Sequence, residues 1–390
     1  MEFSFSPQEL AFRDEVRAFL DAELPADWEG TGDFEEEAGP AEADELVAAF
    51  QKKLAERKWL AMAWPTEYGG GDAGIMEQVI YNEEMAYRRA PVNFSMGVAW
   101  VGPALMIYGT DEQKRRFLPP IARTEEVWCT LYSEPGSGSD LASLQTRASR
   151  DGDEYVINGQ KIWTSGAHRS DWGWLAARTD PDAPKHKGIS MFLLDMKTPG
   201  VTVRPLINMA NSHGFNEVFF DNVRIPAANL VGQENRGWYQ LAVSLDFERS
   251  SIAGSAGAQR TLDDLFAYAR EHRSALSPSL RHRLAEMQIE IEVCRDLSYR
   301  VAAMQAKGMV PNYEASLVKI FSSELSQRLA RSGIDLLGLF GQLERGSKAA
   351  RLKGRMERSY LQSVSATIAG GTSEVNRSVV ATRGLGLPRG

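Results

Sequence analysis

The chain has 390 residues, of which 43% are hydrophobic and 25% are charged, and its formal net charge is −8. This composition is ordinary for a globular protein, and the acidic balance argues against a nucleic-acid-binding surface. A chain of this length is expected to form two or three domains. Its two cysteines, Cys129 and Cys294, are too few for a disulfide framework and indicate a reducing compartment, which we take to be the cytoplasm. No apolar run reaches the roughly 18 residues of a membrane span, no signal-peptide pattern opens the chain, and the five histidines lack metal-ligand spacing.

Helical spacing of apolar residues dominates the first third of the chain. The segment Ser6-Pro-Gln-Glu9 has the pattern of a capping box with proline at the first helical position. A later helix is expected to begin after Thr110 and to stop at the Pro119-Pro120 pair. We therefore expect an all-α N-terminal domain over residues 1–124. Its helices are predicted to start at residue 7 and at about residue 44, and to cover 76–88, 99–108 and 111–118.

The period of the apolar residues changes to two near Glu126, which predicts strands and a small sheet or barrel over residues 125–233. Asn158-Gly159 lies between apolar residues, a strong signal for a hairpin turn. That hairpin would deliver Trp163, Thr164 and Ser165 to the end of one strand. The strand candidates are 127–132, 146–149, 154–163, 172–177, 188–194, 201–205 and 217–225.

Helical spacing returns near Gly237 and continues to about Thr382 in four long segments. Breaks are expected near Ser277-Pro278, near 308–311 and near 343–347. A helical bundle is the simplest packing for such segments, so a C-terminal bundle is predicted over residues 234–390.

One stretch, from Trp128 to Gly166, has the features of a ligand site. Gly136 and Gly138 would let the backbone approach a ligand, and nearby serines and free N–H groups can donate to anionic or carbonyl oxygens. A flat Trp163 beside two hydroxyls suits a planar, polar-edged cofactor ring. The alternatives are a flexible Gly-Ser loop and a tryptophan that belongs to the core.

Four motifs in order resemble the acyl-CoA dehydrogenase family of flavoproteins over essentially the whole chain. They are Glu134-Pro-Gly-Ser-Gly-Ser-Asp140, Asn158-Gly-Gln-Lys-Ile-Trp-Thr-Ser165, Phe220-Asp-Asn-Val-Arg-Ile-Pro226 and Gly370-Gly-Thr-Ser-Glu374. The resemblance implies an α+β multidomain fold with an N-terminal helical domain, a β-barrel-like middle domain and a C-terminal four-helix bundle. It also implies FAD as the cofactor, bound between subunits.

The family reaction removes a proton from Cα of an acyl-CoA and a hydride from Cβ, and the resemblance implies electron transfer to an electron-transfer flavoprotein. One family position for the base is Gly370 here, and glycine cannot act as a base. The alternative position, used in branched- and long-chain members, falls on Glu248, followed by Arg249. We assign Glu248 as the catalytic base; the other interpretation is a surface glutamate paired with its neighbouring arginine. The Gly370 N–H would donate to the thioester carbonyl, and the missing side chain leaves room for a branched or bulky acyl group, including a sterol side chain or a ring-bearing thioester.

The resemblance also assigns binding residues around the cofactor and the CoA. Trp163 matches the residue that covers one flavin face, with Thr164 and Ser165 near the ring edge. The remaining matches are Tyr132 and Ser133 at flavin polar atoms, Gly138 and Ser139 near the FAD phosphates and the CoA chain, Thr372 and Glu374 on the phosphate and ribose side, and Asp246 and Arg249 at the pantetheine and CoA adenine end.

The chain departs from the family where a subunit completes its neighbour's FAD site. The family's Arg-x-x-Phe-Gly turn has lost its Phe, and Arg273 stands in a shifted position. In the later turn a Gln has become Asp335 and a Gly has become Leu339. A carboxylate near a pyrophosphate is repulsive unless it is screened. Two assemblies remain open: a heterotetramer with a homologous subunit that supplies the lost groups, or a homo-oligomer, dimer or tetramer, that manages with Arg273.

Two other functions compete with the dehydrogenase. One is a flavin monooxygenase or oxidase on the same fold, which would react with oxygen. The other is a non-catalytic subunit of a heteromeric dehydrogenase, which the altered turns near Arg273 and Asp335 support. Retention of Glu248, Trp163 and Thr372 favours the dehydrogenase.

Overall fold

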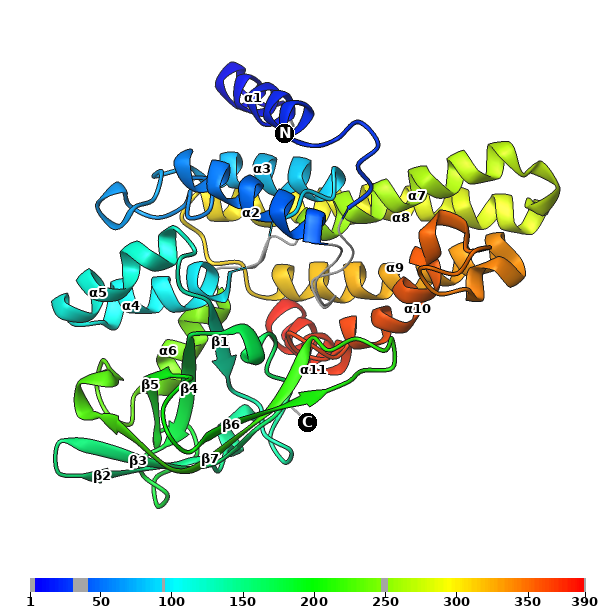
Figure 1. The fold of residues 1–390 in the computed structure, drawn as a ribbon. Helices are drawn as coiled ribbons and strands as arrows, with labels where there is room; N and C mark the ends of the chain where they lie inside the picture. The colour runs from blue at the N-terminus through cyan, green and yellow to red at the C-terminus, as the bar shows by residue number, and fades with distance from the viewer. Residues whose placement is uncertain (1–3, 31–40, 93–94, 247–251, 389–390) are drawn as a thin grey trace. The chain divides into compact units, whose positions relative to one another are not determined.

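The computed structural model describes residues 4–30, 41–92, 95–246 and 252–388, without the side chains of 41–44 and 242–246 (Figure 1). The chain divides into two compact units. The first comprises residues 1–32, 73–91 and 249–390, and the second comprises 33–72 and 92–248. The boundaries expected at residues 124 and 233 stay a prediction, because this division follows packing rather than chain order.

The first unit is helical. Its N-terminal capping box is present: the Ser6 N–H donates to the Glu9 carboxylate at 2.6 Å, and the Glu9 N–H donates to the Ser6 hydroxyl at 3.3 Å. A core that includes Leu265, Leu284 and Leu329 joins the long helices α7, α8 and α9. The helices of this unit are α1 (Pro7–Glu23), α3 (Ile75–Tyr87), α7 (Ile252–Glu271), α8 (Pro278–Ala306), α9 (Tyr313–Leu337), α10 (Arg355–Ala366) and α11 (Ser373–Val379).

The second unit packs helices on an eight-stranded sheet. The sheet has the strand order β6-β7-β3-β2-β4-β5-β8, and β1 pairs in parallel with β4 off this path. Because β6 and β8 lie at the two ends of the order, the sheet is open: of the two expected forms, a small sheet or a barrel, it is the sheet. The elements are α2 (Ala41–Glu56), α4 (Gly102–Tyr108), α5 (Asp111–Ala122), β1 (Trp128–Leu131), β2 (Arg147–Asp151), β3 (Glu154–Lys161), β4 (Trp172–Arg178), β5 (Ile189–Asp195), β6 (Val201–Leu206), β7 (Phe215–Pro226), β8 (Leu230–Val231) and α6 (Gly237–Asp246).

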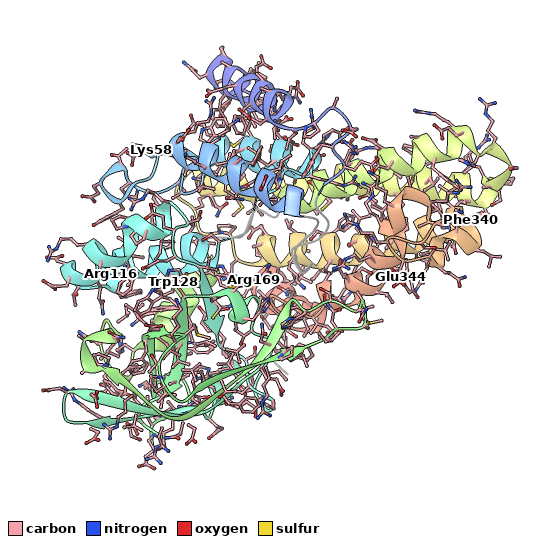
Figure 2. The ribbon with its side chains drawn as sticks, in the orientation of Figure 1. Lys58, Arg116, Trp128, Arg169, Phe340 and Glu344 are labelled. Carbon is pink, nitrogen blue, oxygen red and sulfur yellow. The ribbon has the colours of Figure 1, made fainter. Side chains whose placement is uncertain are left out.

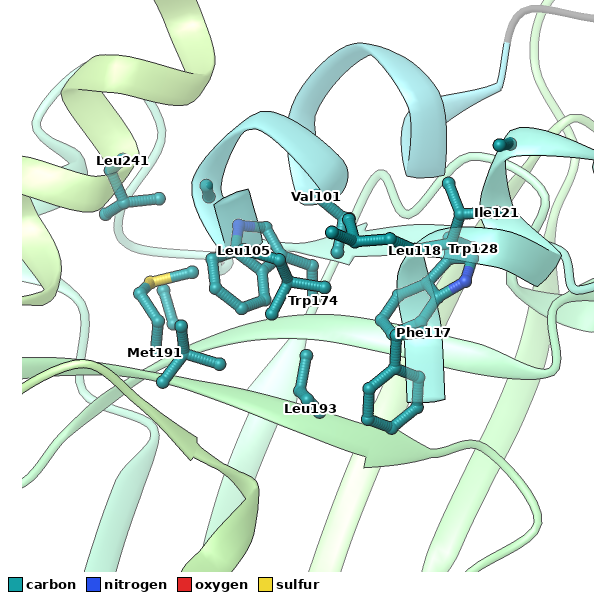
Figure 3. Packing of buried hydrophobic residues seen from close by; sticks show 14 of the residues in the cluster. Val101, Leu105, Phe117, Leu118, Ile121, Trp128, Trp174, Met191, Leu193 and Leu241 are labelled. Atoms are coloured by element: carbon teal, nitrogen blue, oxygen red, sulfur yellow. The ribbon is translucent and has the colours of Figure 1, made fainter. Parts of the chain in front are cut away.

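All seven predicted strands are present, and the two-residue β8 was missed because it is too short to show a period. The main core of this unit lies between the sheet and α4 and α5. There Trp174 and Leu193 of the sheet pack against Leu105 and Phe117 of the helices (Figure 3). This core fixes β1 and β4, and with them the loops at their ends.

The predicted hairpin at Asn158-Gly159 is wrong. Both residues lie inside β3, which pairs with β2 on one side and with β7 on the other and has a bulge between Ile157 and Gly159. A Cβ at Gly159 would lie 2.7 Å from the Thr146 Cα, so glycine is needed here for close packing and not for a turn. The hairpin turn falls instead at Gly152, which has a φ of +62°.

The predicted stop of α5 at Pro119-Pro120 is also wrong, because the helix continues to Ala122. The carbonyls of both prolines accept backbone bonds from beyond the helix end, Arg123 N–H at 3.3 Å and Glu125 N–H at 2.9 Å. The last turn buries Ile121, which compensates for the amides that proline lacks. Within the described ranges, no helix has both the length and the apolar composition that crossing a membrane requires.

Candidate active site

The loop after β1 is a tight turn. Glu134 and Ser137 exchange two backbone hydrogen bonds, with N···O distances of 2.9 and 3.0 Å. The Ser137 hydroxyl then donates to the carbonyl of Asp140 at 2.9 Å. Gly136 and Gly138 are exposed, and an added Cβ on either would meet no atom of the described residues within 4 Å. The loop therefore presents accessible backbone, which close approach of a ligand requires.

A buried ion pair holds this turn to the end of β3. The Lys161 ammonium is 0% exposed and lies 2.8 Å from a Glu134 carboxylate oxygen. The same carboxylate accepts the backbone N–H groups of Gln145 at 2.5 Å and Thr146 at 2.8 Å. Burial lowers the pKa of Lys161 to about 8, against the opposing effect of Glu134. Burial raises the pKa of Glu134, but the charge and hydrogen bond of Lys161 and the backbone donors outweigh it, so its net pKa is lowered.

This pair brings together two predicted cofactor segments. The Lys161 ammonium also donates to the carbonyl of Tyr132 at 2.9 Å. One residue on, the Ile162 N–H donates to the carbonyl of Ser133 at 2.9 Å. Tyr132 and Ser133, which follow β1, are thus fixed beside the residues that follow β3. In the sequence, Lys161 falls at a strand position that alternation directs toward the core, where a lysine needs a partner. The sequence analysis did not use this signal.

The residues after β3 form a strained turn. Trp163 has a φ of +60°, which is unusual for a bulky residue, and its side chain is 57% exposed. Its ring meets Phe215 edge-on, with the centroids 6.0 Å apart. Thr164 is 1% exposed, and among the described residues its hydroxyl has no hydrogen-bond partner. Ser165 is half-buried beside it, and the exposed Arg169 follows on the next short turn (Figure 2).

This edge of the sheet fits a planar group with polar edges. It offers the exposed face of Trp163, a buried Thr164 hydroxyl without a partner, and open space at Gly136, Gly138 and Gly166. A buried hydroxyl left unpaired is costly, so a ligand that supplies its partner is favoured. In the part of the chain that is described, no group of three or more His, Cys, Asp or Glu residues could hold a metal ion.

The C-terminal motif, in the first unit, is another segment that the sequence analysis assigned to ligand binding. Gly370 and Gly371 have φ values of +65° and +90°, which favour glycine at both positions. The Thr372 hydroxyl caps α11 by accepting the Val375 N–H at 3.1 Å. Glu374, which is exposed, has a lowered pKa because its own backbone N–H and the Thr372 side chain favour the carboxylate.

Side chains of helix α9 contact this motif and the residues just before it. The Lys319 ammonium donates to the carbonyl of Ala366 at 2.8 Å, and burial lowers its pKa. The Lys319 Cε is also the nearest atom to a Cβ built at Gly370, at 4.0 Å. Arg377 of α11 pairs with Glu324 of α9 at 2.5 Å. Gly370, Thr372 and Glu374 therefore lie together on one short segment fixed by α9.

The altered turns lie at the ends of the long helices. Arg273 is exposed on the short turn after α7. The Asp335 carboxylate pairs with Arg283 at 2.8 Å, so its charge is compensated within the chain. Leu339, on the turn after α9, is 81% exposed, next to Phe340 (Figure 2). Asp246 is the last residue of α6 and its side chain is not described, while Glu248 and Arg249 lie outside the described residues.

Comparison with protein families settles what kind of protein this is. The descriptions that match are the acyl-CoA dehydrogenase N-terminal domain over residues 6–125, the middle domain over 129–223 and the C-terminal domain over 235–385. The chain belongs to the acyl-CoA dehydrogenase family. It is therefore an oxidoreductase of a flavoprotein family, with N-terminal helical, middle sheet and C-terminal helical domains.

Several relatives match over their whole length. Acyl-CoA dehydrogenase FadE26 of Mycobacterium tuberculosis is 36% identical over 100% of this chain and 99% of its own. Acyl-CoA dehydrogenase IpdE1 of the same organism is 35% identical over 97% of each chain. Among solved structures, the Tcur3481-Tcur3483 steroid ACAD is 36% identical with a TM-score of 0.90, and the ChsE4-ChsE5 complex from Mycobacterium tuberculosis is 35% identical with a TM-score of 0.87. Both cover 100% of this chain and 100% of their own.

Proposed function

We propose that this chain catalyses the FAD-dependent α,β-dehydrogenation of an acyl-CoA thioester that carries a branched or bulky acyl group. The observation that carries the proposal is the turn at Trp163 and Thr164, where an exposed indole adjoins a buried hydroxyl without a partner. The isoalloxazine ring of FAD is planar and has hydrogen-bonding groups on its edge, so it matches both features.

In this proposal Glu248 takes the proton from Cα of the acyl group. An α-proton is a weak acid, so the developing charge on the thioester oxygen needs a fixed donor, and the Gly370 N–H is assigned to it. The base needs a pKa raised by a dry site. A hydride leaves Cβ, and the product is the 2-enoyl-CoA. Bound FAD supplies the acceptor for that hydride.

The remaining site residues of the sequence analysis are proposed in the same roles. Tyr132, Ser133, Trp163, Thr164 and Ser165 lie on one edge of the sheet, which supports their joint contact with a flavin ring. The other proposed ligand-binding residues are Gly138, Ser139, Thr372, Glu374 and Arg273 for the cofactor and Ser139, Asp246 and Arg249 for the substrate.

The bulky acyl group is supported by Gly370 and by the names of relatives. Among the described residues, only Lys319 comes within 4 Å of a Cβ built at Gly370, which supports free volume where the family carries a side chain. One similar solved structure is called a steroid ACAD. We therefore propose a ring-bearing or branched thioester as the substrate, with an electron-transfer flavoprotein as the acceptor.

A mixed oligomer is the proposed assembly. By the resemblance, Asp335 and Leu339 occupy positions from which the family lends groups to a neighbour's FAD; here Asp335 is paired with Arg283 and Leu339 is exposed. One of the similar solved structures is described as a ChsE4-ChsE5 complex, which supports a second, homologous chain. A homo-oligomer is the alternative. We propose a cytoplasmic location, because two cysteines are too few for a disulfide framework and both are buried free thiols.

The test has two stages. FAD content and native mass are measured on the chain purified alone and after co-expression with a homologous neighbour. The loaded protein is then mixed without oxygen with a steroid side-chain CoA thioester and with a straight-chain thioester. We expect the visible absorbance of the flavin to be lost only with acyl-CoA, and faster with the bulky substrate. Faster bleaching by straight chains contradicts the substrate proposal, and rapid reoxidation by air favours the oxidase.

A further inference from the structure

We infer that Asn216 is a positioning residue of this site, which holds the turn at Trp163, Thr164 and Ser165 in the shape that faces the cofactor. This inference rests on the proposed flavin-dependent function. Asn216 lies near the start of β7 and is 0% exposed, although it is polar. No part of the sequence analysis singled it out.

Asn216 forms hydrogen bonds with Thr164 through both its backbone and its side chain. The Thr164 N–H donates to the Asn216 carbonyl at 3.0 Å, and the Asn216 N–H donates back to the Thr164 carbonyl at 3.0 Å. The Asn216 side-chain amide gives the same carbonyl a second donor at 3.1 Å. Two residues on, the Gly166 N–H donates to the carbonyl of Gly214 at 2.9 Å. The first residues of β7 and those just before them thus continue the pairing beyond the end of β3.

Two histidines fix the orientation of the Asn216 amide. The Thr164 carbonyl can only accept, so the amide nitrogen must face it. The second hydrogen of that nitrogen then points to His168 Nδ1 at 3.1 Å, which acts as the acceptor. The amide oxygen faces His213 Nε2 at 2.9 Å, which acts as the donor. The two imidazole rings stack with their centroids 4.1 Å apart, so they hold the amide as a pair.

The turn needs such support because its conformation is not favoured by its own sequence. Trp163 has a φ of +60°, a strained region that a bulky residue keeps only where its surroundings impose it. The buried Thr164 hydroxyl has no hydrogen-bond partner within the described ranges, so no bond of its own side chain fixes the turn. Asn216 supplies three hydrogen bonds to the Thr164 backbone, and these hold the turn that carries the exposed Trp163 ring.

The decisive variant is Asn216→Leu, which keeps the approximate size and removes the polar atoms. Its matched control is Asn158→Ala, which removes an exposed contact to Asn222 between the same two strands, β3 and β7. In the FAD-free chain we expect the amides of Thr164 and Gly166 to exchange with solvent about tenfold faster in Asn216→Leu and at the normal rate in the control. In the loaded protein we expect flavin reduction per bound FAD to slow about tenfold at saturating acyl-CoA, with little change in KM.

A merely structural role predicts a different pattern. Asn216→Leu would then lose thermal stability and FAD content, while the bound flavin would be reduced at the normal rate and local exchange would match that of the control. That pattern overturns the inference. If Asn216→Leu does not fold, Asn216→Asp decides, because its carboxylate still accepts from His213 but cannot donate to Thr164. Normal exchange at Thr164 in Asn216→Asp overturns the inference as well.

The proposed function and this inference fail separately. If no acyl-CoA reduces the wild-type flavin, the proposed reaction is wrong. Faster exchange at Thr164 and Gly166 in Asn216→Leu would still support the positioning role in that case, since it is measured without substrate or cofactor.

Discussion

The residues that would contact the chain's own flavin differ from those that would complete a neighbour's. Around Trp163 the turn is tied down by the buried pair of Glu134 and Lys161 and by Asn216. At the altered turns, by contrast, Arg273 is exposed and Leu339 is 81% exposed. A buried network costs stability when it is incomplete, whereas an exposed turn can change freely. The turn at Trp163 is therefore fixed by buried contacts, whereas the altered turns lie on the surface of the chain.

The largest expected effect comes from breaking the buried ion pair of Lys161 and Glu134. Lys161→Met leaves the Glu134 carboxylate buried without its cation, which we expect to cost about 3–5 kcal/mol of the free energy of unfolding and most of the FAD. Thermal unfolding and flavin content measure this. The double variant Glu134→Gln/Lys161→Met is the control, since it removes both charges and should recover much of the loss. Equal losses in the single and double variants would show that charge is not the cause.

The next effect tests the assigned chemistry. Glu248→Gln keeps the size of the side chain and removes its basicity, so we expect FAD content to stay normal and acyl-CoA-dependent flavin bleaching to slow about a thousandfold. Stopped-flow absorbance under anaerobic conditions measures the rate. A rate close to that of the wild type would refute Glu248 as the base and would favour a surface pair with Arg249.

A smaller effect is expected at Gly370. Gly370→Ala adds a Cβ to a position with a φ of +65°, which costs about 1–2 kcal/mol of backbone strain and narrows the space beside the substrate. We expect the kcat/KM for a bulky thioester to fall about tenfold more than that for a straight chain. Gly308→Ala, with a φ of +71° and no described atom within 4 Å of the added Cβ, controls for strain alone. An equal fall for both substrates would argue against the proposed acyl group.

The pH dependence of stability gives a further test of the buried pair. The pKa of Lys161 is lowered to about 8 by burial, below the usual value of 10.5 that applies to the unfolded chain. Between these two values the unfolded chain binds more protons, so the contribution of Lys161 to stability becomes more favourable as the pH rises through this window. Denaturant unfolding from pH 7.5 to 10.5 should therefore show the wild type gaining stability relative to Lys161→Met. A constant difference would mean that the pKa of Lys161 is not lowered.

The sequence predicted much of this structure where the signal is local. Seven strands, the capping box at Ser6 and the order of helical and strand regions follow from residue periodicity and cap chemistry. The hairpin predicted at Asn158-Gly159 was wrong, because close packing against Thr146 overrides the local preference for a turn. The inward position of Lys161 on a strand was a signal in the sequence, but its partner Glu134 could not be read from it. The role of Asn216 gave no such signal, since its partners are distant in the chain and meet it only in the folded sheet.

The smallest expected effect is at the altered turns that carry Asp335 and Leu339. Asp335→Gln/Leu339→Gly restores the residues that the family carries at these turns. Asp335 and Arg283 form a pair of partly exposed side chains, so its removal should change stability by less than about 1 kcal/mol. If the chain works in a mixed oligomer because these turns no longer serve a neighbouring copy, the double variant purified alone should hold more FAD and form a larger homo-oligomer than the wild type. Gln342→Ala, on the same turn, is the matched control. One FAD per chain in the wild-type homo-oligomer, unchanged in the double variant, would instead mean that the altered turns still complete the site and that their exposure reflects no loss of function.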